Sequence, residues 1–422
     1  MKSAGSNPEA AEAGSPAAVV AGAYFTGIRL MRQLRRRGVE VACFDCDPSQ
    51  PGFRSVYGSA YHCPDPDEHL VEWTDFMIGL ARRMGDRPVL IPASDKFVTA
   101  MANRAAALAE HFRFASSTAT AQALLATKKR QYEAAARHGL DAPRTAWVSS
   151  LEEVAAFAAG ARFPCLLKPN HFREWERFPP GHPLRFQKTA LADSPVELES
   201  QYRLAAEETP QLMVQEVIQG PDTAKLVYLA CYAQSGERIG ACVLRELRAT
   251  PPHFGSASVV EPVEDREVNR RCDVFLRAIG YTGICEIELK RDCRDSVPRL
   301  IEANPRYSVT ADAAPYAGTD LGWLHYLDLI GRKVVPVIPP PRDVRHIVLQ
   351  RDFACFRSYL REGLTTWRDI IRSYRPPVGF FDFDLRDYRV TARHSIDLLK
   401  ELIGPSIRRV FPRRNRRPHQ GQ

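Results

Sequence analysis

Four polar residues have the types and spacing of a site for a metal ion and a phosphate. Residues 301–306 read Ile-Glu-Ala-Asn-Pro-Arg, so Glu302, Asn304 and Arg306 share one face of a strand. Glu288 lies fourteen positions before Glu302, in a second alternating stretch. Carboxylate and amide oxygens suit Mg²⁺, which keeps some waters and takes further ligands from nucleotide phosphates. These residues therefore predict a site for Mg²⁺ and ATP, with the guanidinium of Arg306 on a phosphate oxygen.

A β-hairpin would bring these residues together. Residues 291–297, between the two alternating stretches, are charged and turn-forming. Closing the hairpin places Glu288 beside Glu302 and Asn304. The alternative is two neighbouring strands that merely carry exposed carboxylates. That alternative does not account for an acid, an amide and a guanidinium on a single face.

The same residues resemble a known family. Glu288, followed by Glu302, Asn304 and Pro305-Arg306, is similar to the metal-binding signature of the ATP-grasp superfamily. Within it, the chain resembles the carboxylate–amine ligases that include D-aspartate ligase. The resemblance extends from about residue 19 to residue 331. It implies an α/β fold class, in which two α+β subdomains clamp ATP and a Rossmann-like parallel-sheet domain precedes them.

The resemblance also assigns nucleotide-binding residues by position. Lys128, at the start of a predicted helix, and Lys168, at the end of the apolar strand 163–168, correspond to phosphate contacts. The strand 212–218 resembles the hinge between the two subdomains, whose extended backbone would face adenine. The adenine-binding residues expected there are Gln215, Glu216, Val217 and Ile218.

Asp222 has two readings of equal weight. It resembles the acid that hydrogen-bonds the ribose, and it also belongs to a turn-forming Gly-Pro-Asp sequence. Arg245 and Arg248 correspond to a segment near the γ-phosphate and the carboxylate to be activated, where a bidentate arginine fork is suitable. The plain alternative is an arginine pair that solvates an edge strand.

The loop at residues 170–187 departs from the family. Relatives have a glycine-rich loop there that closes over the triphosphate, whereas this loop contains only Gly181. Basic side chains could replace its backbone contacts with phosphate. The candidates are His171, Arg173, Arg177 and Arg185, together with Lys188 just after the loop.

The start of the chain predicts a βαβ unit from strand 18–23, helix 28–37 and strand 40–44. A nicotinamide-dependent oxidoreductase could begin in this way, with Asp45 or Asp47 on the ribose, but Gly-x-Gly-x-x-Gly spacing is absent. Alternating helices and strands continue the pattern and favour a parallel sheet. Ser94 and Asp95 follow a predicted strand, where they either cap a helix or face a ligand.

Composition and the positions of turn-forming residues divide the chain into four parts. Residues 1–16 are rich in Ala, Gly, Ser, Pro and Glu and are expected to be disordered. Residues 17–123 form the Rossmann-like domain, residues 124–335 the ATP-grasp domain, and residues 336–422 a C-terminal extension with a basic tail. The extension shows no recognisable chemistry, and we expect it to pack against the ATP-grasp domain.

Composition also restricts the class of protein. With 422 residues and 45% hydrophobic content, the chain can bury a sizeable core. No apolar run approaches the roughly 20 residues that span a bilayer. The ten cysteines lack the spacing of a disulfide framework, and the Cys-x-x-Cys pair of Cys43 and Cys46 has no second pair to complete a zinc site. We therefore expect a cytoplasmic protein.

The net charge of +8 includes a terminal run of arginines without an acidic residue. A solvated terminus is the favoured interpretation over contact with nucleic acid or a membrane. The arginines of the run are Arg408, Arg409, Arg413, Arg414, Arg416 and Arg417.

The sequence thus predicts an ATP-dependent ligase that joins a small carboxylate to an amine through an acyl phosphate. Amino acids are the expected substrates. ATP and Mg²⁺ are the expected cofactors, with Mn²⁺ as the alternative ion. A non-catalytic nucleotide-binding regulator is the main rival. The acid, the amine and the oligomeric state, including a homo-oligomer, stay open.

Overall fold

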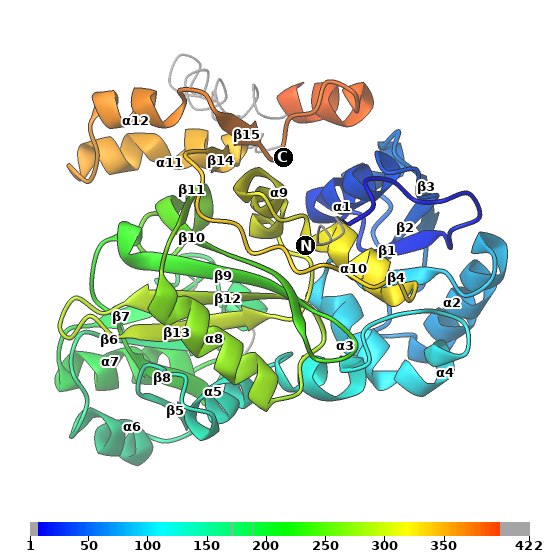
Figure 1. Cartoon of the computed structure of the whole chain (residues 1–422). Helices are drawn as coiled ribbons and strands as arrows, with labels where there is room; N and C mark the ends of the chain where they lie inside the picture. The colour runs from blue at the N-terminus through cyan, green and yellow to red at the C-terminus, as the bar shows by residue number, and fades with distance from the viewer. Residues whose placement is uncertain (1–6, 170–171, 188, 397–422) are drawn as a thin grey trace, which may run out of the picture. The chain divides into compact units, whose positions relative to one another are not determined.

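The computed structural model describes residues 7–169, 172–187 and 189–396 (Figure 1). It divides the chain into two compact units. Unit 1 contains Met1–Ala134, Pro221–Glu288 and Glu302–Gln422, and unit 2 contains Ala135–Gly220 and Leu289–Ile301.

Unit 1 begins with a four-stranded parallel sheet in the order β3-β2-β1-β4. Its strands are β1 (Ala18–Ala21), β2 (Val41–Asp45), β3 (Ser59–His62) and β4 (Val89–Pro92). Its helices are α1 (Phe25–Arg35), α2 (Leu70–Met84), α3 (Asp95–Asn103) and α4 (Ala105–Ala109). Every residue of β1 and β4 is buried, as expected for strands covered on both faces. The predicted βαβ start and parallel sheet are confirmed.

The turn after β1 requires a glycine. Gly22 has a φ of +122°, which L side chains rarely adopt. The next residue, Ala23, donates its N–H to the Asp45 carboxylate at 2.9 Å. Asp45 also accepts from the N–H of Asp47 at 3.1 Å. Asp45, the acid that an oxidoreductase would use on a ribose, therefore holds two turns of the backbone instead.

A seven-stranded sheet follows in the order β13-β12-β9-β10-β11-β14-β15. Its strands are β9 (Lys225–Tyr232), β10 (Arg238–Thr250), β11 (Ser256–Val263), β12 (Gly283–Arg291), β13 (Pro298–Asn304), β14 (Arg345–Ile347) and β15 (Val378–Phe380). The helices in these parts of the chain are α5 (Lys128–Arg137), α8 (Arg266–Ala278), α9 (Ala314–Ala317), α10 (Leu321–Leu329), α11 (Leu349–Arg361) and α12 (Trp367–Ser373). The adjacency of β12 and β13 confirms the hairpin predicted around residues 291–297.

The C-terminal extension is more closely integrated than the sequence indicated. β14 pairs with β11, and β15 pairs with β14, so residues beyond 336 continue the sheet that carries the predicted metal residues. The N-terminal segment is also held. The Asn7 side chain bonds both main-chain groups of Val335 at 2.7 Å, and Ala11 donates its N–H to Arg37. This corrects the predicted disorder for residues 7–16, while residues 1–6 and the arginines after residue 396 lie outside the described residues.

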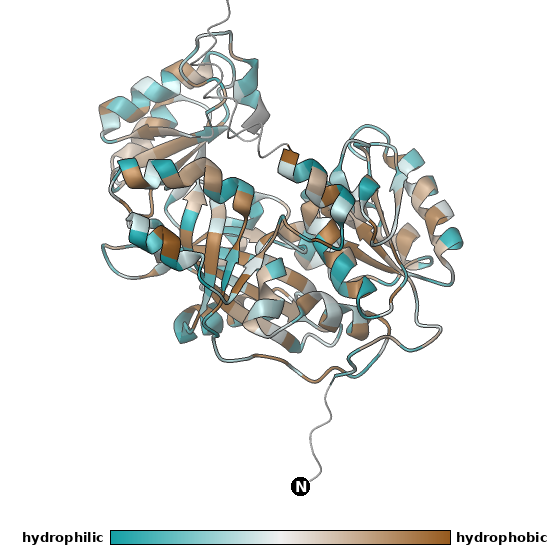
Figure 2. Ribbon diagram, turned by 90° about the horizontal axis from the view of Figure 1, so that it is seen from above, coloured by the Kyte–Doolittle hydropathy of each residue, from teal (hydrophilic) through white to brown (hydrophobic). Residues whose placement is uncertain are grey.

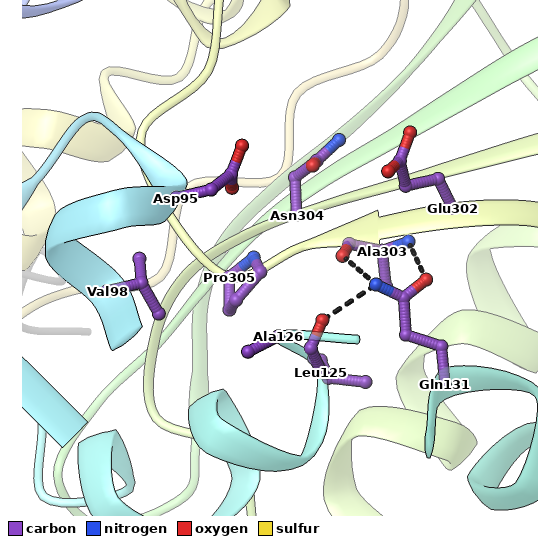
Figure 3. Close-up of a pocket in the computed structure, with 9 residues that line it drawn as sticks. All are labelled: Asp95, Val98, Leu125, Ala126, Gln131, Glu302, Ala303, Asn304 and Pro305. Carbon is purple, nitrogen blue, oxygen red and sulfur yellow. Dashed lines mark hydrogen bonds between the residues drawn. The ribbon is translucent and has the colours of Figure 1, made fainter. Parts of the chain in front are cut away.

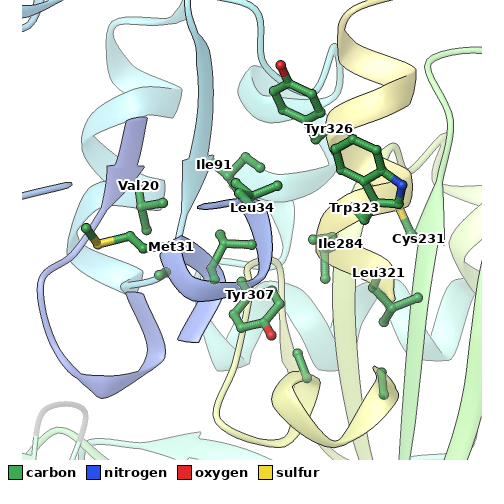
Figure 4. Packing of buried hydrophobic residues seen from close by; sticks show 14 of the residues in the cluster. Val20, Met31, Leu34, Ile91, Cys231, Ile284, Tyr307, Leu321, Trp323 and Tyr326 are labelled. Carbon is green, nitrogen blue, oxygen red and sulfur yellow. The ribbon is translucent and has the colours of Figure 1, made fainter. Parts of the chain in front are cut away.

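A hydrophobic core joins the two sheets of unit 1 (Figure 4). It contains Val20 and Ile91 of the parallel sheet, Leu34 of α1, Ile284 of β12 and Trp323 of α10. Burying these side chains fixes the carboxyl end of β4 beside the chain that leaves β13. There the N–H of Tyr307 donates to the carbonyl of Pro92 at 3.0 Å.

Unit 2 contains an antiparallel sheet in the order β5-β8-β6-β7. Its elements are β5 (Thr145–Val148), α6 (Leu151–Ala158), β6 (Cys165–Pro169), β7 (Ala190–Ala192), α7 (Pro195–Ala206) and β8 (Leu212–Glu216). Ser150 and Ser194 cap α6 and α7 by accepting a backbone N–H, and a separate core fills the space under the sheet.

Hydrophobic and hydrophilic residues alternate along many of the helices, as in amphipathic helices that cover a sheet with one face (Figure 2). Among the described residues, none of the helices combines the length and apolar character needed to cross a membrane.

Candidate active site

The predicted metal residues gather where β12 and β13 lie side by side. Strand alternation puts Glu302 and Asn304 on one side of β13, and Ala303 on the other (Figure 3). On its own side, Ala303 exchanges two hydrogen bonds with the Gln131 side chain, at 2.8 and 2.9 Å. These bonds tie β13 to α5 and fix the strand's rotation, which leaves Glu302 and Asn304 on the side of the strand opposite Gln131.

Asn304 is held by an acid that sequence reasoning did not single out. Its Nδ2 donates to Glu286 at 2.9 Å, and Ser308 donates its hydroxyl to the other oxygen of Glu286 at 2.7 Å. Glu286 is buried and lies two residues before Glu288, on the same face of β12. Burial raises the pKa of Glu286, although the hydrogen bond from Ser308 and the charge of Arg306 oppose this rise.

Two of the predicted cations lie beside these acids. The Nζ of Lys128 is 3.6 Å from Glu302, and the Nη2 of Arg306 is 3.3 Å from the Oδ1 of Asn304. Burial lowers the pKa of Lys128, but the attraction of Glu302 outweighs it and the net shift is upward. Arg306 also makes a bidentate pair with Asp95 at the start of α3, at 2.6 and 2.9 Å. The structure therefore brings Lys128, Glu302, Asn304 and Arg306 together.

Glu288 lies in a strongly acidic environment. Its pKa is raised well above the ordinary value by burial and by repulsion from Glu286, Glu302 and, more weakly, Glu246. Lys225 opposes this rise. It is buried in β9, 2.9 Å from Glu246 on β10 and 3.4 Å from Asp222. Acids on β10, β12 and β13 thus outnumber the lysine that lies among them.

A small pocket opens beside the cluster (Figure 3). Its volume is about 50 Å³, which suits a few waters or an ion rather than a nucleotide. The residues that line it include Asp95, Glu302, Asn304 and Pro305, along with Leu125, Ala126 and Gln131.

The donor set fits Mg²⁺. Glu288 and Glu302 offer carboxylates and Asn304 an amide oxygen, which are hard ligands. Burial and the neighbouring carboxylates of Glu286 and Glu302 raise the pKa of Glu288, and a divalent cation bound there would offset the repulsion among these acids. Within the described ranges, no group of three or more His, Cys, Asp or Glu side chains could hold a metal by itself. The predicted site differs from such a cage because it uses two acids and an amide, and takes further ligands from phosphate.

The residues predicted to bind the nucleotide base lie in unit 2. Lys168 on β6 pairs in register with Met213 on β8, and Gln215 lies farther along β8. The N–H of Glu216 donates to Arg144, and the N–H of Val217 donates to Pro164. The carbonyl of Val217 accepts from Arg294 at 3.1 Å.

The Glu216 side chain is used inside unit 2 as well. Its carboxylate accepts from the N–H of Arg162 at 2.9 Å and lies 3.4 Å from the Nε of the same residue. The main-chain N–H groups of Glu216 and Val217 are therefore engaged by the protein. Gln215 pairs in the sheet with Thr145 on β5 and with Leu166 on β6, so its main chain also lies within the sheet of unit 2.

Asp222 is buried, and its contacts favour the turn over the ribose. It accepts from the N–H of His253 at 2.9 Å and from the hydroxyl of Tyr359 on α11. Burial raises its pKa, but the charge of Lys225 and the bond from Tyr359 outweigh that effect and leave the pKa lowered. Asp222 thus anchors the start of β9 to α11.

The two arginines of β10 have different surroundings. Arg248 is buried and makes a bidentate pair with Asp352 on α11 at 2.7 and 2.8 Å, and it also donates to Ser373 at 2.9 Å. Its fork is therefore directed at α11 and α12. Arg245 is about half exposed and pairs with Glu261 on β11. Neither contact tests the predicted role in carboxylate binding, although the fork of Arg248 already has a carboxylate partner.

The loop at 170–187 is described only in part. His171, Lys188 and the side chain of Arg173 lie outside what the structure describes. The described part contains a short 3-10 helix, Phe172–Arg177, and a stacked pair of Phe178 and His182 with ring centroids 3.8 Å apart. Arg185 lies over the ring of Phe186 at 4.7 Å.

Sequence reasoning missed Glu286, Lys225 and Glu246 at this site. Glu286 carried a usable signal, because strand alternation places it on the same face as Glu288. Lys225 and Glu246 gave no local signal, since their proximity depends on the register of β9 and β10. Asp95 was noted as a residue that caps a helix or faces a ligand, and its contact with Arg306 places it beside the acids.

Comparisons with known proteins support the fold through structure alone. No protein-family model matches the chain, and no curated protein sequence matches it. A solved structure of the ADP complex of purK, an N5-carboxyaminoimidazole ribonucleotide synthetase, matches with a TM-score of 0.61 and 13% identity, covering 83% of this chain and 86% of the other.

Two further solved structures match over similar lengths. The biotin carboxylase domain of 2-oxoglutarate carboxylase from Hydrogenobacter thermophilus, in complex with MgADP, has a TM-score of 0.57 and 15% identity, with coverages of 75% and 70%. An L-amino acid ligase from Bacillus licheniformis has a TM-score of 0.54 and 14% identity, with coverages of 76% and 75%. These likenesses show that the chain has the ATP-grasp fold, and the predicted fold class is confirmed.

Proposed function

We propose that the protein is an ATP-dependent ligase that joins a small carboxylate to an amine and releases ADP and phosphate. The observation that carries the proposal is the gathering of Glu288, Glu302 and Asn304 on neighbouring strands of an ATP-grasp fold, with Lys128 and Arg306 beside them. The names of the structural neighbours, which include a synthetase, a carboxylase and an amino acid ligase, support the same class of reaction.

The reaction follows from the chemistry of carboxylates, which are poor electrophiles. A carboxylate oxygen first attacks the γ-phosphorus of ATP, which forms an acyl phosphate as ADP leaves. The amine nitrogen then attacks the acyl carbon, phosphate leaves, and the nitrogen loses a proton. Neither step needs a nucleophilic Ser, Cys or His from the protein. Catalysis would come from positioning and from charge neutralisation.

Each residue of the cluster has a task in this proposal. Glu288, Glu302 and Asn304 would hold Mg²⁺, which supplies charge stabilisation on the transferring phosphoryl group when bound. Lys128, beside Glu302, would neutralise phosphate charge. Arg306 would contribute a planar fork, already held in position by Asp95 and Asn304.

The nucleotide would draw on residues of unit 2. Lys168 would contact phosphate, and the segment that contains Gln215 and Ile218 would receive the adenine. The main-chain N–H and carbonyl of Val217 already make hydrogen bonds within unit 2. In this proposal, adenine is therefore bound by other residues of the segment.

The carboxylate substrate is the least constrained part of the proposal. Arg245, half exposed, is favoured over Arg248, whose fork is paired with buried Asp352. The acid and the amine are proposed to be small molecules, with amino acids as the first candidates. A cytoplasmic location and the use of Mn²⁺ in place of Mg²⁺ stay predictions.

An ADP-release screen across amino acids and small carboxylates tests the proposal. A ligase releases ADP only with a matching acid, or with an acid and amine together, and mass spectrometry then identifies an amide product. Binding of ATP without ADP release for any pair, under conditions where Mg²⁺ and the acid are saturating, would favour the non-catalytic regulator.

A further inference from the structure

Glu286 is the acid of the cluster whose role the reaction does not require. It is buried, and both of its carboxylate oxygens accept hydrogen bonds from the protein. Oε1 accepts from the Nδ2 of Asn304 at 2.9 Å, and Oε2 accepts from the hydroxyl of Ser308 at 2.7 Å. Glu288, two residues along the same strand, is half-buried instead. The two neighbouring acids of β12 therefore lie in different surroundings.

The contacts of Asn304 determine which end of its amide faces the pocket. Its Nδ2 points at the Glu286 carboxylate, and its Oδ1 points at the guanidinium of Arg306, 3.3 Å away. The reversed amide would bring Oδ1 against a carboxylate oxygen and Nδ2 against a cationic donor, so both contacts would become repulsive. An amide oxygen has two acceptor lone pairs, so the bond from Arg306 leaves capacity for a cation.

We propose that Glu286 is a positioning residue that orients Asn304, so that the amide oxygen rather than the amide nitrogen faces the metal. The inference rests on the proposed function, because it assumes that Asn304 contributes to a metal site. In this proposal Glu286 acts through Asn304, because its two oxygens accept from Nδ2 and from the hydroxyl of Ser308; direct ligation by Glu286 is the alternative that the substitutions below separate from it. Ser308 fixes the carboxylate, and Glu286 in turn fixes the amide.

If Glu286 is a positioning residue, a conservative substitution should preserve metal affinity. If Glu286 is a direct ligand, the same substitution should reduce it. In Glu286→Gln, the new amide oxygen can still accept from Asn304, and the new amide nitrogen can donate to the hydroxyl oxygen of Ser308. The charge is lost, but the orientation of Asn304 is kept. In Glu286→Leu, the acceptor for Asn304 is lost and its amide is free to reverse.

The experiment measures the affinity of the full-length protein for Mn²⁺ in the presence of ADP, by following free Mn²⁺ with electron paramagnetic resonance. We expect Glu286→Gln to bind Mn²⁺ within about threefold of the wild type and Glu286→Leu to bind about 10- to 100-fold more weakly, the usual effect of removing a group that orients a metal ligand. Ser308→Ala should weaken binding by up to about 10-fold, and it provides the readout if Glu286→Leu does not fold. Thermal melting establishes that each variant is folded.

Two outcomes would overturn the proposal. If Glu286→Gln loses as much affinity as Glu302→Gln, then Glu286 is a direct ligand. If Glu286→Leu and Ser308→Ala, both folded, bind Mn²⁺ as the wild type does, then Glu286 does not orient Asn304. Failure of the proposed function looks different, because Glu302→Gln itself would then retain wild-type Mn²⁺ affinity.

Discussion

Unit 1 contains two groups of charged residues in which burial raises the pKa of an acid, but the net pKa shifts are opposite. Around Glu288, neighbouring carboxylates repel one another, and the pKa of Glu288 is raised well above its ordinary value. Around Asp312, burial also raises the pKa, but the hydrogen bond from His346 and the charge of Arg32 outweigh it, and the pKa is lowered. The difference lies in the partners and not in the burial.

The partners of Asp312 come from distant parts of the sequence. Arg32 and Gln33 of α1 donate to it at 3.2 and 3.1 Å, and the Nε2 of His346 on β14 lies 3.1 Å away. Asp384 receives Arg32 as well, at 3.3 Å. This paired group joins the parallel sheet region to the C-terminal extension. Paired acids therefore maintain the architecture, whereas the crowding of acids near Glu288 is the feature on which the proposed metal site depends.

The largest expected effect comes from removing a polar side chain from the proposed metal site near Glu288. Glu302→Ala or Asn304→Ala should lower kcat/KM by about 1,000-fold or more, because each removes a metal oxygen that would act in phosphoryl transfer. The melting temperature of Glu302→Ala should change little, since loss of this carboxylate relieves repulsion on Glu288. Steady-state ADP release and thermal melting check both parts. A folded Glu302→Ala protein with near-normal Mg²⁺-dependent turnover would refute the site.

Removing the acid at the centre of the paired group, Asp312, should lower stability and leave nucleotide binding unchanged. Asp312→Ala leaves Arg32 and His346 without their shared acceptor, and we expect the free energy of unfolding to fall by about 3–5 kcal/mol. The protein that remains folded should keep its nucleotide affinity. Urea unfolding and ADP titration measure the two quantities. A stable Asp312→Ala protein with impaired nucleotide binding would show that this group belongs to the active site.

A comparison of lysines extends the test to unit 2. Lys168→Met should weaken ATP binding by at least about 10-fold, since it removes a charge-assisted contact to phosphate. Lys129→Met, the control, should change ATP binding by less than about twofold, since Lys129 is exposed and adjoins the predicted phosphate contact Lys128 without occupying its position. Isothermal titration with a non-hydrolysable ATP analogue gives both affinities. Equal losses would show that the sequence register through residues 127–130 has no predictive value.

A further prediction concerns a buried base. Burial lowers the pKa of His325 on α10 from its ordinary 6.5 to about 4, and its buried Nδ1 makes no hydrogen bond with any residue that the structure describes. The unfolded chain therefore binds more protons between pH 6.5 and 4, so stability should fall as the pH decreases through this range. The loss should be at most about 3 kcal/mol. His325→Leu should flatten the pH dependence of urea unfolding, and an unchanged slope would contradict this account.

Local pattern was sufficient to predict that the proposed metal residues lie together. Glu302, Asn304 and Arg306 share a face by strand alternation, and the turn-forming residues between β12 and β13 implied the hairpin that brings Glu288 to them. The parallel sheet followed from the same kind of periodicity, whereas the hinge role of strand 212–218 was implied only by the family resemblance. These features depend on residues close together in sequence, and for that reason they could be read without a structure.

Contacts between distant segments could not be predicted in the same way. The pairing of Arg248 with Asp352 depends on where α11 lies, and the contact of Asp222 with Tyr359 depends on the same helix. Residues beyond 336 gave no recognisable pattern, because β14 and β15 are only three residues long and their hydrogen bonds are made with a sheet formed much earlier in the chain. The predicted roles of Asp222 and Arg248 came from aligned position, which does not reveal such partners.

The most direct test of the central claim follows the oxygen atoms of the carboxylate substrate. With an ¹⁸O-labelled acid identified by the ADP-release screen, the acyl-phosphate route delivers one labelled oxygen from the carboxylate into phosphate for each amide formed, with ADP as the nucleotide product. Mass spectrometry of the phosphate measures that transfer. Unlabelled phosphate during verified amide formation, or AMP and pyrophosphate as products, would contradict the account even though the fold is that of ATP-grasp proteins.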